Sequence, residues 1–260
     1  MHGHGHQHDH GQEHGHGHEH GHSHGPYDKH RNPEDFARYL GKLEDPERKA
    51  WQMPERVVDA LGLRPGDVAC DVGAGTGYLA LRMARAVGPE GAVYAIDVDS
   101  RMIEEIGKRI GESGIENVHP ILSDARRGAL PPRRCQVILV VNAYHHFPDG
   151  AGYLKRLAGR LAPGGRIVIV DFHKRELPVG PPPGHKISGT ELAAEARRAG
   201  LEVARERRFL PYQYFLELAP IRGRAPGRGP GKGKAGVKAT RPPPRGPRPG
   251  ARGRAGRSTR

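Results

Sequence analysis

The sequence predicts an α/β fold built around a mostly parallel sheet of seven strands, with helices on both faces and an antiparallel last strand. Short apolar runs alternate with amphipathic segments through the middle of the chain, which is typical of such a sheet. The run Gln136–Val141 is almost entirely apolar, as expected of a central parallel strand. Only two residues separate the last strand-like runs, Val203–Phe209 and Tyr212–Leu218, which favours an antiparallel ending.

Turn and capping signals place the other elements in order. The turn Arg64–Gly66 precedes the first strand, Pro163–Gly165 ends the helix before the fifth strand, and Ser188–Glu191 is a capping box. Apolar residues at helical spacing mark the helices between them. The first five strands are predicted at residues 67–72, 92–96, 117–122, 136–141 and 166–170. Helices are predicted at residues 77–87, from 99 or 100 to about 110, at 150–161 and at 188–200.

Composition divides the chain into three zones. Residues 1–25 alternate His with Gly, and residues 221–260 hold 13 Lys and Arg with no acidic residue, so we expect both ends to be disordered. Residues 26–220 are expected to fold, with N-terminal helices at 27–61 and a core at 62–220. Because the chain has 42 basic and 29 acidic residues, the 29 basic residues before the tail balance the acids. The net charge of +13 therefore belongs to the tail and not to the fold.

These features limit the partners and the location of the protein. The basic tail at 221–260 predicts non-specific attachment to nucleic acid or another acidic surface, although a merely solubilising extension is the alternative. The sequence contains no run of about 18 apolar residues, so no membrane span is predicted. The His-rich start lacks the apolar core of a secretory signal peptide. Cys70 and Cys135 lie in or beside strand-like runs, which favours reduced core residues in a cytoplasmic protein.

The His-rich arm predicts metal binding. Neutral imidazoles are ligands for zinc and nickel, and a flexible His-Gly chain can bring several of them to one ion. A low-complexity extension without a metal-linked role is the alternative. The candidate ligands are His2, His4, His6, His8, His10, His14, His16 and His18.

A glycine-rich loop follows the first predicted strand in the pattern Asp71-Val-Gly-Ala-Gly-Thr-Gly77. Glycines let the backbone turn tightly and approach a ligand, and the helix that follows offers unpaired N–H groups. The dinucleotide fingerprint counted from Gly73 requires a small residue at position 78, where Tyr78 stands. A register starting at Gly75 fits less well, so a nicotinamide cofactor is disfavoured but stays open.

The loop and four later segments resemble class I S-adenosylmethionine-dependent methyltransferases, of the type 11 and ubiquinone/menaquinone-biosynthesis kind. The other segments are Asp97, Ser123-Asp124, Asn142–Phe147 and Leu161–Gly165, each beside a predicted strand. The resemblance covers about residues 50–218 and implies a Rossmann-like fold with S-adenosylmethionine as cofactor. It implies that Asp97 binds the ribose, that Ser123-Asp124 contacts the adenine, and that Asn142 lies beside the transferred methyl group. The cofactor-binding residues expected from it are Asp71, Gly73, Ala74, Gly75, Gly77, Asp97, Val98, Ser123, Asp124 and Asn142.

The general base is the least determined part of the predicted site. His145 and His146 follow the fourth strand, and either could take a proton from a hydroxyl or an amine of the acceptor. Both could instead be structural hydrogen-bond donors. The segment His173–Ile187 leaves the same edge of the sheet and could form the rim of an acceptor pocket. The lone Trp51, in the N-terminal helices, is expected to pack onto the core.

We therefore expect an enzyme that transfers a methyl group to a small molecule. No Asn/Asp-Pro-Pro-aromatic tetrad follows the fourth strand, which disfavours amines of nucleic-acid bases as acceptors. The two cysteines are too few for the arsenite-methylating relatives. A nicotinamide-nucleotide oxidoreductase and a metal- or nucleic-acid-binding protein with a vestigial methyltransferase fold are the alternatives.

Overall fold

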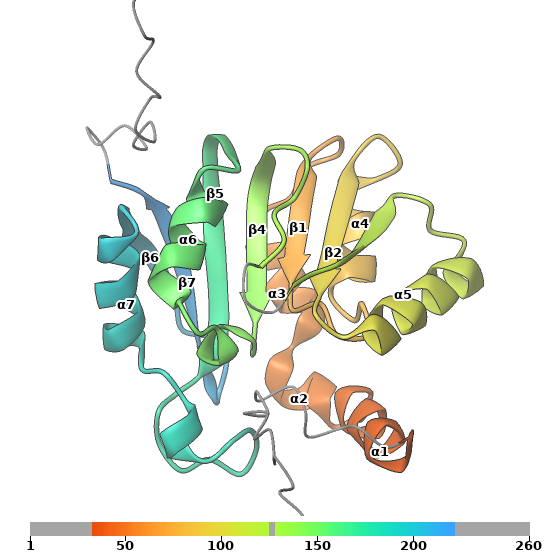
Figure 1. Cartoon of the computed structure of the whole chain (residues 1–260), viewed down its shortest axis with the longest axis horizontal. Coiled ribbons are helices and arrows are strands. Elements are labelled where there is room, and N and C mark those ends of the chain that lie inside the picture. The colour runs from red at the N-terminus through yellow and green to blue at the C-terminus, as the bar shows by residue number, and fades with distance from the viewer. Residues whose placement is uncertain (1–32, 125–127, 222–260) are drawn as a thin grey trace, which may run out of the picture. The chain divides into compact units, whose positions relative to one another are not determined.

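A single seven-stranded sheet organises residues 33–124 and 128–221, which are the residues that the computed structural model describes (Figure 1). The strand order is β3-β2-β1-β4-β5-β7-β6. All pairings from β3 to β5 are parallel, whereas β7 runs antiparallel to both of its neighbours, as predicted. The strands are β1 Val68–Val72, β2 Ala92–Asp97, β3 Val118–Leu122, β4 Cys135–Val141, β5 Leu161–Phe172, β6 Leu201–Arg207 and β7 Gln213–Pro220.

Two apolar cores lie on the two faces of the sheet. Successive residues of a strand point to opposite faces, so a strand buried on both sides is apolar throughout. Every residue of β1 is buried. In β4, Val137 belongs to one core and its neighbour Ile138 to the other. This is the physical reason that the central strands could be recognised as continuous apolar runs.

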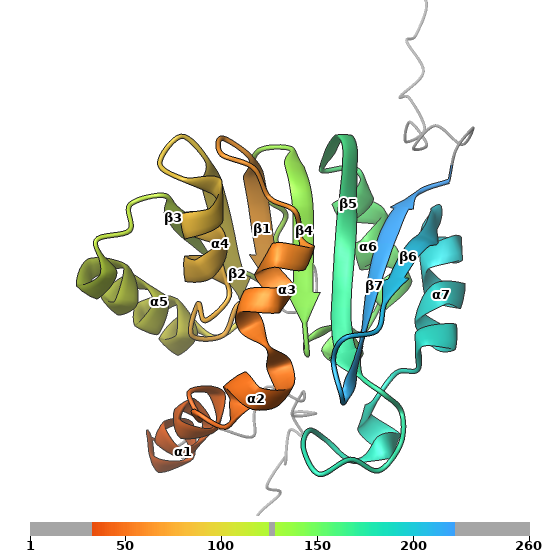
Figure 2. The same cartoon turned by 180° about the vertical axis from the view of Figure 1, so that it is seen from behind.

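Helices cover both faces (Figures 1 and 2). Helices α3 (Pro54–Ala60), α4 (Ala80–Val87) and α5 (Ser100–Ser113) supply residues to the first core. Helices α6 (Gly150–Ala158) and α7 (Gly189–Arg198) supply residues to the second. The capping box that the sequence predicts is present, because the side chain of Ser188 accepts from the N–H of Glu191 and the Glu191 side chain accepts from the N–H of Ser188.

Several predicted boundaries differ from the structure by two residues or more. Helix α4 begins at Ala80 and not at residue 77, because Gly77 has a φ of 76°, which a right-handed helix cannot contain. Helix α6 ends at Ala158. Strand β5 begins at Leu161, so the predicted turn Pro163–Gly165 lies inside it, at an irregularity where the register against β4 shifts.

The carboxyl ends of the parallel strands meet at the lower edge of the sheet in Figure 1, where other segments also gather. Helices α1 (Pro33–Leu43) and α2 (Arg48–Gln52) lie there, within the N-terminal helical region predicted at 27–61. The connection from β5 to α7 lies at the same edge and contains one short helical turn, η3 (Pro183–His185). This edge is where ligands bind in open α/β sheets.

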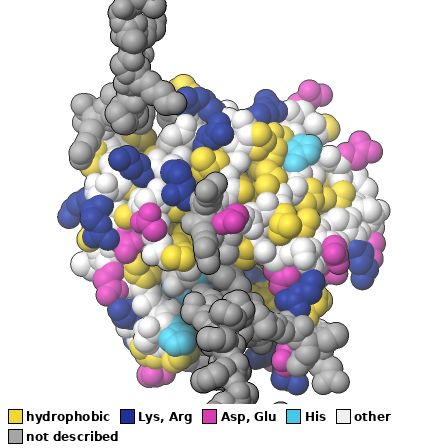
Figure 3. Space-filling view, in the orientation of Figure 1, with side chains coloured by type: hydrophobic (Ala, Val, Ile, Leu, Met, Phe, Trp, Pro, Cys, Tyr) yellow, Lys and Arg dark blue, Asp and Glu magenta, His cyan; other side chains and the backbone are white. Residues whose placement is uncertain are grey.

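The two predicted arms fall outside the described residues. This applies to the His-rich arm at 1–25, with all its candidate metal ligands, and to the tail apart from Ile221, whose N–H donates to the carbonyl of Gly200. Cys70 and Cys135 are both buried and free, as expected. Among the described helices, none has the length and apolar character needed to cross a membrane. Lys and Arg side chains are interspersed with Asp and Glu on the face shown in Figure 3, in line with the charge balance of this region.

Candidate active site

The glycine loop between β1 and α4 has the backbone conformation that its sequence predicts. Gly73, Gly75 and Gly77 have φ values of 74°, 55° and 76°, in the left-handed region that favours glycine. The N–H groups of Gly73 and Ala74 both donate to the carbonyl of Ile96, at 2.8 and 3.0 Å, and attach the loop to β2. A Cβ atom on Gly73 would lie 2.5 Å from the Cβ of Ala143, so the loop also touches the segment after β4.

Asp97, at the end of β2, is hydrogen-bonded to the loop. Its Oδ2 accepts from the N–H of Gly75 at 2.8 Å, and its Oδ1 accepts from the N–H of Asp99 at 3.0 Å. Burial raises the pKa of the Asp97 carboxyl above its usual value. Each oxygen of a carboxylate can accept two hydrogen bonds, so Asp97 retains capacity for a ligand diol.

Asp71 gives the site a second buried carboxyl group. Its side chain lies at the end of β1 and is 2% exposed. Burial, followed by the charge of Asp97, raises the pKa of Asp71 to about 7. Two carboxyl groups that oppose each other's ionisation favour a positively charged ligand between the first and second strands.

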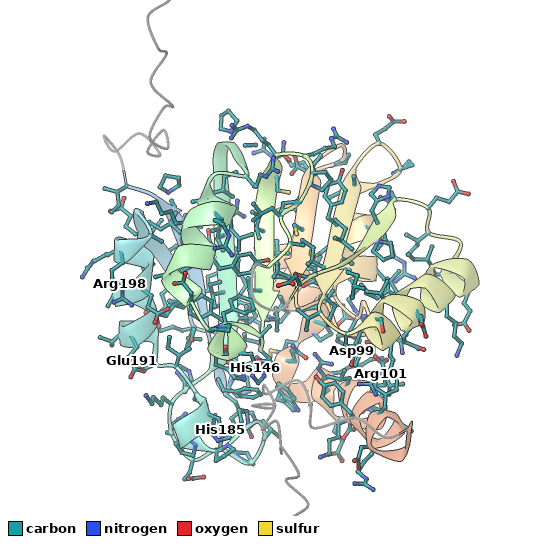
Figure 4. The ribbon with its side chains drawn as sticks, in the orientation of Figure 1. Asp99, Arg101, His146, His185, Glu191 and Arg198 are labelled. Atoms are coloured by element: carbon teal, nitrogen blue, oxygen red, sulfur yellow. The ribbon has the colours of Figure 1, made fainter. Side chains whose placement is uncertain are left out.

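The start of α5 lies beside the same strand end. Asp99 caps this helix by accepting from the N–H of Arg101 at 3.0 Å, as the sequence predicts. The Arg101 guanidinium in turn pairs with the carboxylate of Asp99 at 2.6 Å. Figure 4 shows both residues at the lower edge, next to helix α1.

The end of β3 brings one of its two predicted residues to Asp97. The N–H of Ser123 donates to the backbone carbonyl of Asp97 at 2.7 Å, and the Ser123 side chain is buried. The Ser123 hydroxyl oxygen accepts from the N–H of Ala129 at 2.6 Å. Asp124 is exposed, and its carbonyl accepts from the N–H of Gly128. Val98 lies between Asp97 and the cap of α5.

Helix α1 covers the glycine loop, a role that the sequence did not assign to particular residues. A Cβ atom on Gly75 would lie 3.6 Å from the Cδ1 of Leu43. The hydroxyl of Thr76 donates to Glu44 at 2.5 Å, and Arg109 of α5 pairs with Glu44 at 3.0 Å. Burial, followed by the charge of Asp97, raises the pKa of the hydroxyl of Tyr39, another residue of α1.

The segment after β4 starts with a strained residue. Asn142 has a φ of 53°, which is uncommon for a residue other than glycine. Its N–H donates to the carbonyl of Val170 at 2.9 Å, and its Oδ1 accepts from Nε2 of Gln213 at 2.6 Å. Gln213 lies on β7 and is 1% exposed, and its Oε1 has no hydrogen-bond partner among the described residues. Gln213 was not predicted from the sequence.

The two predicted histidines lie on the short helical turn η2 (Tyr144–His146). Nδ1 of His145 lies 3.0 and 2.9 Å from the two carboxylate oxygens of Asp171. The rings of His145 and His146 lie with their centroids 4.1 Å apart and their planes tilted by 49°. Figure 4 shows His146 at the lower edge of the sheet. Asp171 ends the apolar run of β5 as Asp97 ends β2, a signal that could have identified it.

The connection after β5 forms an outer part of this edge. Phe172 packs against Trp51 of α2, with ring centroids 5.6 Å apart, so Trp51 contacts this connection. Burial and then the charge of Arg175 lower the pKa of His173. An open pocket of about 330 Å³ is lined by His173, Lys174, Arg175, Ser188 and Gly189.

Residues 69–165 match the family described as methyltransferase domain. These residues contain the glycine loop, Asp97 and the turn that carries His145. The chain contains a methyltransferase domain. Within the described ranges, no group of three or more His, Cys, Asp or Glu side chains is arranged to hold a metal ion.

The relatives and solved structures that this domain resembles are methyltransferases, and one of the solved structures is S-adenosylmethionine-dependent. The chain is 33% identical over 132 residues to an aklanonic acid methyltransferase of Streptomyces sp. strain C5, covering 50% of this chain and 60% of that protein. It is 32% identical over 154 residues to a demethylmenaquinone methyltransferase of Staphylococcus aureus, covering 58% and 62%. It thus spans less than two thirds of these curated relatives.

A solved structure extends the similarity over more of the domain. A SAM-dependent methyltransferase from Aquifex aeolicus aligns with a TM-score of 0.65 and 29% identity, covering 70% of this chain and 96% of that one. The mitomycin 7-O-methyltransferase MmcR aligns with a TM-score of 0.58 and 19% identity over 75% of this chain and 60% of that one, which supports the fold alone. The predicted family and fold class are confirmed.

Proposed function

We propose that the protein transfers a methyl group from S-adenosylmethionine to a small-molecule acceptor. The observation that carries this proposal is the hydrogen bond from Gly75 to Asp97, which joins a glycine loop to a carboxylate at the ligand edge of the sheet. A glycine loop next to a carboxylate suits a nucleoside. The loop lets the nucleoside approach the backbone, and the carboxylate accepts hydrogen bonds from the ribose diol.

The residues around the loop fit this cofactor in charge as well as in shape. S-adenosylmethionine supplies an electrophilic methyl group on a sulfonium ion, and it also carries an ammonium group. The raised pKa values of Asp71 and Asp97 indicate that a cation beside them would be stabilised. We therefore assign the methionine and ribose portions to Asp71, Gly73, Ala74, Gly75, Gly77 and Asp97.

The remaining predicted contacts follow from their places at the same edge. Val98 and Ser123 adjoin Asp97 in space, which suits contacts to the adenine ring, and Asp124 follows Ser123. Asn142 begins the segment that touches Gly73 through Ala143 and is assigned to the methyl-donating end. The chain's contribution is to hold the donor and the acceptor in line, because orientation alone can supply a large part of such a rate enhancement.

The proposed acceptor is a small molecule. The two relatives named above act, by their names, on aklanonic acid and on demethylmenaquinone, both small molecules. The charge-balanced fold provides no support for a nucleic-acid substrate. None of the named relatives is an oxidoreductase, so the nicotinamide alternative gains no support either.

We propose that the protein is cytoplasmic and that its two terminal arms take no part in methyl transfer. The tail at 221–260 would attach to nucleic acid or another acidic surface, and the arm at 1–25 would bind zinc or nickel. Deleting residues 222–260 should abolish salt-dependent binding to RNA without changing methyl transfer. Deleting residues 1–25 should abolish zinc binding measured by calorimetry.

The acceptor can be found with methyl-labelled S-adenosylmethionine and a metabolite extract of cells. We expect the wild-type protein to move label into one small molecule, with S-adenosylhomocysteine as the second product. Label in RNA, DNA or protein alone would contradict the proposed acceptor class. No transfer, together with binding of a nicotinamide nucleotide, would support the oxidoreductase alternative.

A further inference from the structure

His145 and Asp171 form a buried pair of the kind that prepares an imidazole to accept a proton. Both carboxylate oxygens of Asp171 lie within 3.0 Å of Nδ1 of His145. A carboxylate at that distance accepts the Nδ1 proton, so the lone pair of the neutral ring is on Nε2. Among the described residues, no hydrogen-bond partner is found for Nε2 of His145.

Three strands fix the direction of this imidazole. Asp171 is fully buried in β5, where it pairs with Tyr214 of β7, and it also accepts from the N–H of Phe172 at 2.8 Å. The segment that carries His145 starts at Asn142, whose side chain accepts a hydrogen bond from Gln213. The His145 side chain is only 6% exposed. A ring held through Nδ1 by a buried carboxylate is positioned more precisely than a surface histidine.

The pair lies beside the proposed cofactor loop. Ala143, two residues before His145, is so close to Gly73 that no Cβ atom could fit there. The acceptor must meet the donor near this contact, because Gly73 belongs to the loop that would hold the methionine portion. The geometry points to His145 as the base that deprotonates the methyl acceptor and to Asp171 as the residue that positions it. This inference rests on the proposed function.

The chemistry limits the acceptor to a class. A histidine near neutral pH removes a proton effectively from a phenolic or enolic hydroxyl, whose acidity is far closer to its own than that of an aliphatic alcohol. The hydroxyl proton moves to Nε2 of His145. The electron pair of the resulting anion, on the oxygen or on the carbon conjugated with it, forms the new bond to the methyl carbon. The carbon–sulfur bond breaks, its electron pair stays on sulfur, and the imidazolium later releases its proton to solvent.

Gln213 supports the same class of acceptor. Its buried Oε1 has no partner among the described residues, and a buried carbonyl without one costs free energy that a ligand donor would restore. Gln213 pairs with Phe172, the residue after Asp171, so it lies at the same strand ends as the His145–Asp171 pair. A second hydroxyl or an N–H on the acceptor would satisfy it.

The test compares His145→Gln, Asp171→Asn and Asp171→Glu with a matched control, His119→Gln, which changes an exposed histidine on β3. Labelled S-adenosylmethionine and the metabolite extract serve as the probe, and initial rates are measured across pH. The titratable groups around His145 are Asp171 of β5, His146 on the same turn, and Tyr214 of β7 beside Asp171. The wild-type rate should therefore rise with pH as the base loses its proton, and then level off.

We expect His145→Gln to lower the rate about 100-fold or more, as loss of a general base does, and to remove the plateau. Asp171→Asn should lower the rate and shift the pH profile. Asp171→Glu keeps the carboxylate and should retain part of the wild-type rate. The control should transfer label like the wild type, and all variants should bind S-adenosylhomocysteine with unchanged affinity. Nitrogen-15 spectra should show the Nδ1–H form of His145, and that form should be lost in Asp171→Asn.

Several outcomes would overturn the inference while leaving methyl transfer intact. One is a His145→Gln rate within three-fold of wild type, and another is an unchanged pH profile in Asp171→Asn. A labelled product formed from an amine, a thiol or a molecule without a phenolic or enolic hydroxyl would overturn the acceptor class. Failure of the wild type to bind S-adenosylhomocysteine or to transfer label would instead contradict the proposed function.

Discussion

The carboxylate of Asp97 accepts a hydrogen bond from the N–H of Gly75, across 2.8 Å and 22 residues of sequence. This bond joins the end of β2 to the loop that follows β1, so the residues proposed to hold the ribose and the methionine portion form one unit. A substitution at either end should therefore affect both parts of the proposed cofactor site.

Gly73→Ala should destabilise the fold and weaken S-adenosylhomocysteine binding. The new Cβ would be strained at a φ of 74° and would also collide with Ala143 at 2.5 Å. We expect a loss of about 2–4 kcal/mol in the free energy of unfolding, since strain and overpacking add. Gly66→Ala is the matched control, because Gly66 has a φ of 85° but open space around it. Equal losses in urea denaturation would show that the contact with Ala143 has no effect.

Asp71 should make the ligand-free protein less stable as the pH rises. Its pKa is about 7 in the fold and near 3.8 in an unfolded chain, so the folded state binds more protons between these values. The stabilising effect is complete below about pH 4 and is lost as the pH rises through about 7. Asp71→Asn should flatten this part of a stability–pH curve, whereas Asp59→Asn, at an exposed position of α3, should leave it unchanged. A curve with the same slope in wild type and Asp71→Asn would contradict the assignment.

Glu44→Ala should loosen helix α1. Glu44 accepts from the Thr76 hydroxyl and pairs with Arg109, so it connects the cover to the glycine loop and to α5. Amide hydrogens of residues 33–43 should exchange faster in the variant, and S-adenosylhomocysteine should dissociate about ten-fold faster. Glu47→Ala, at an exposed position nearby, is the control. If the two variants exchange at the same rate, the contacts of Glu44 do not hold the cover.

Much of the fold could be predicted because strands that are buried on both faces of the sheet are apolar throughout. The apolar runs of β1 and β4, and the cap formed by Ser188, are local signals that no distant contact overrides. Strand β5 was predicted too short because Pro163–Gly165 has the composition of a turn. In the structure these residues form an irregularity within the strand, which pairing with β4 makes possible.

The residues of the candidate site also differ in how far the sequence could predict them. Asp97 could be predicted, because its position at a strand end near a glycine loop is visible in the sequence. Asp171 and Gln213 could not be connected to His145 and Asn142, because those contacts span 26 and 71 residues and depend on the pairing of β5 with β4 and with β7. The particular contacts of α1 with the glycine loop could not be predicted either, since an amphipathic helix does not indicate which loop it will contact.

Calorimetric titration with S-adenosylhomocysteine tests the central claim most directly. The wild-type protein and Asp59→Ala should bind it at micromolar concentrations. Asp97→Ala should bind about 100-fold or more weakly, because it removes two hydrogen bonds to a charged group that a ribose would make. No binding by the folded wild-type protein, or equal binding by Asp97→Ala, would contradict the account.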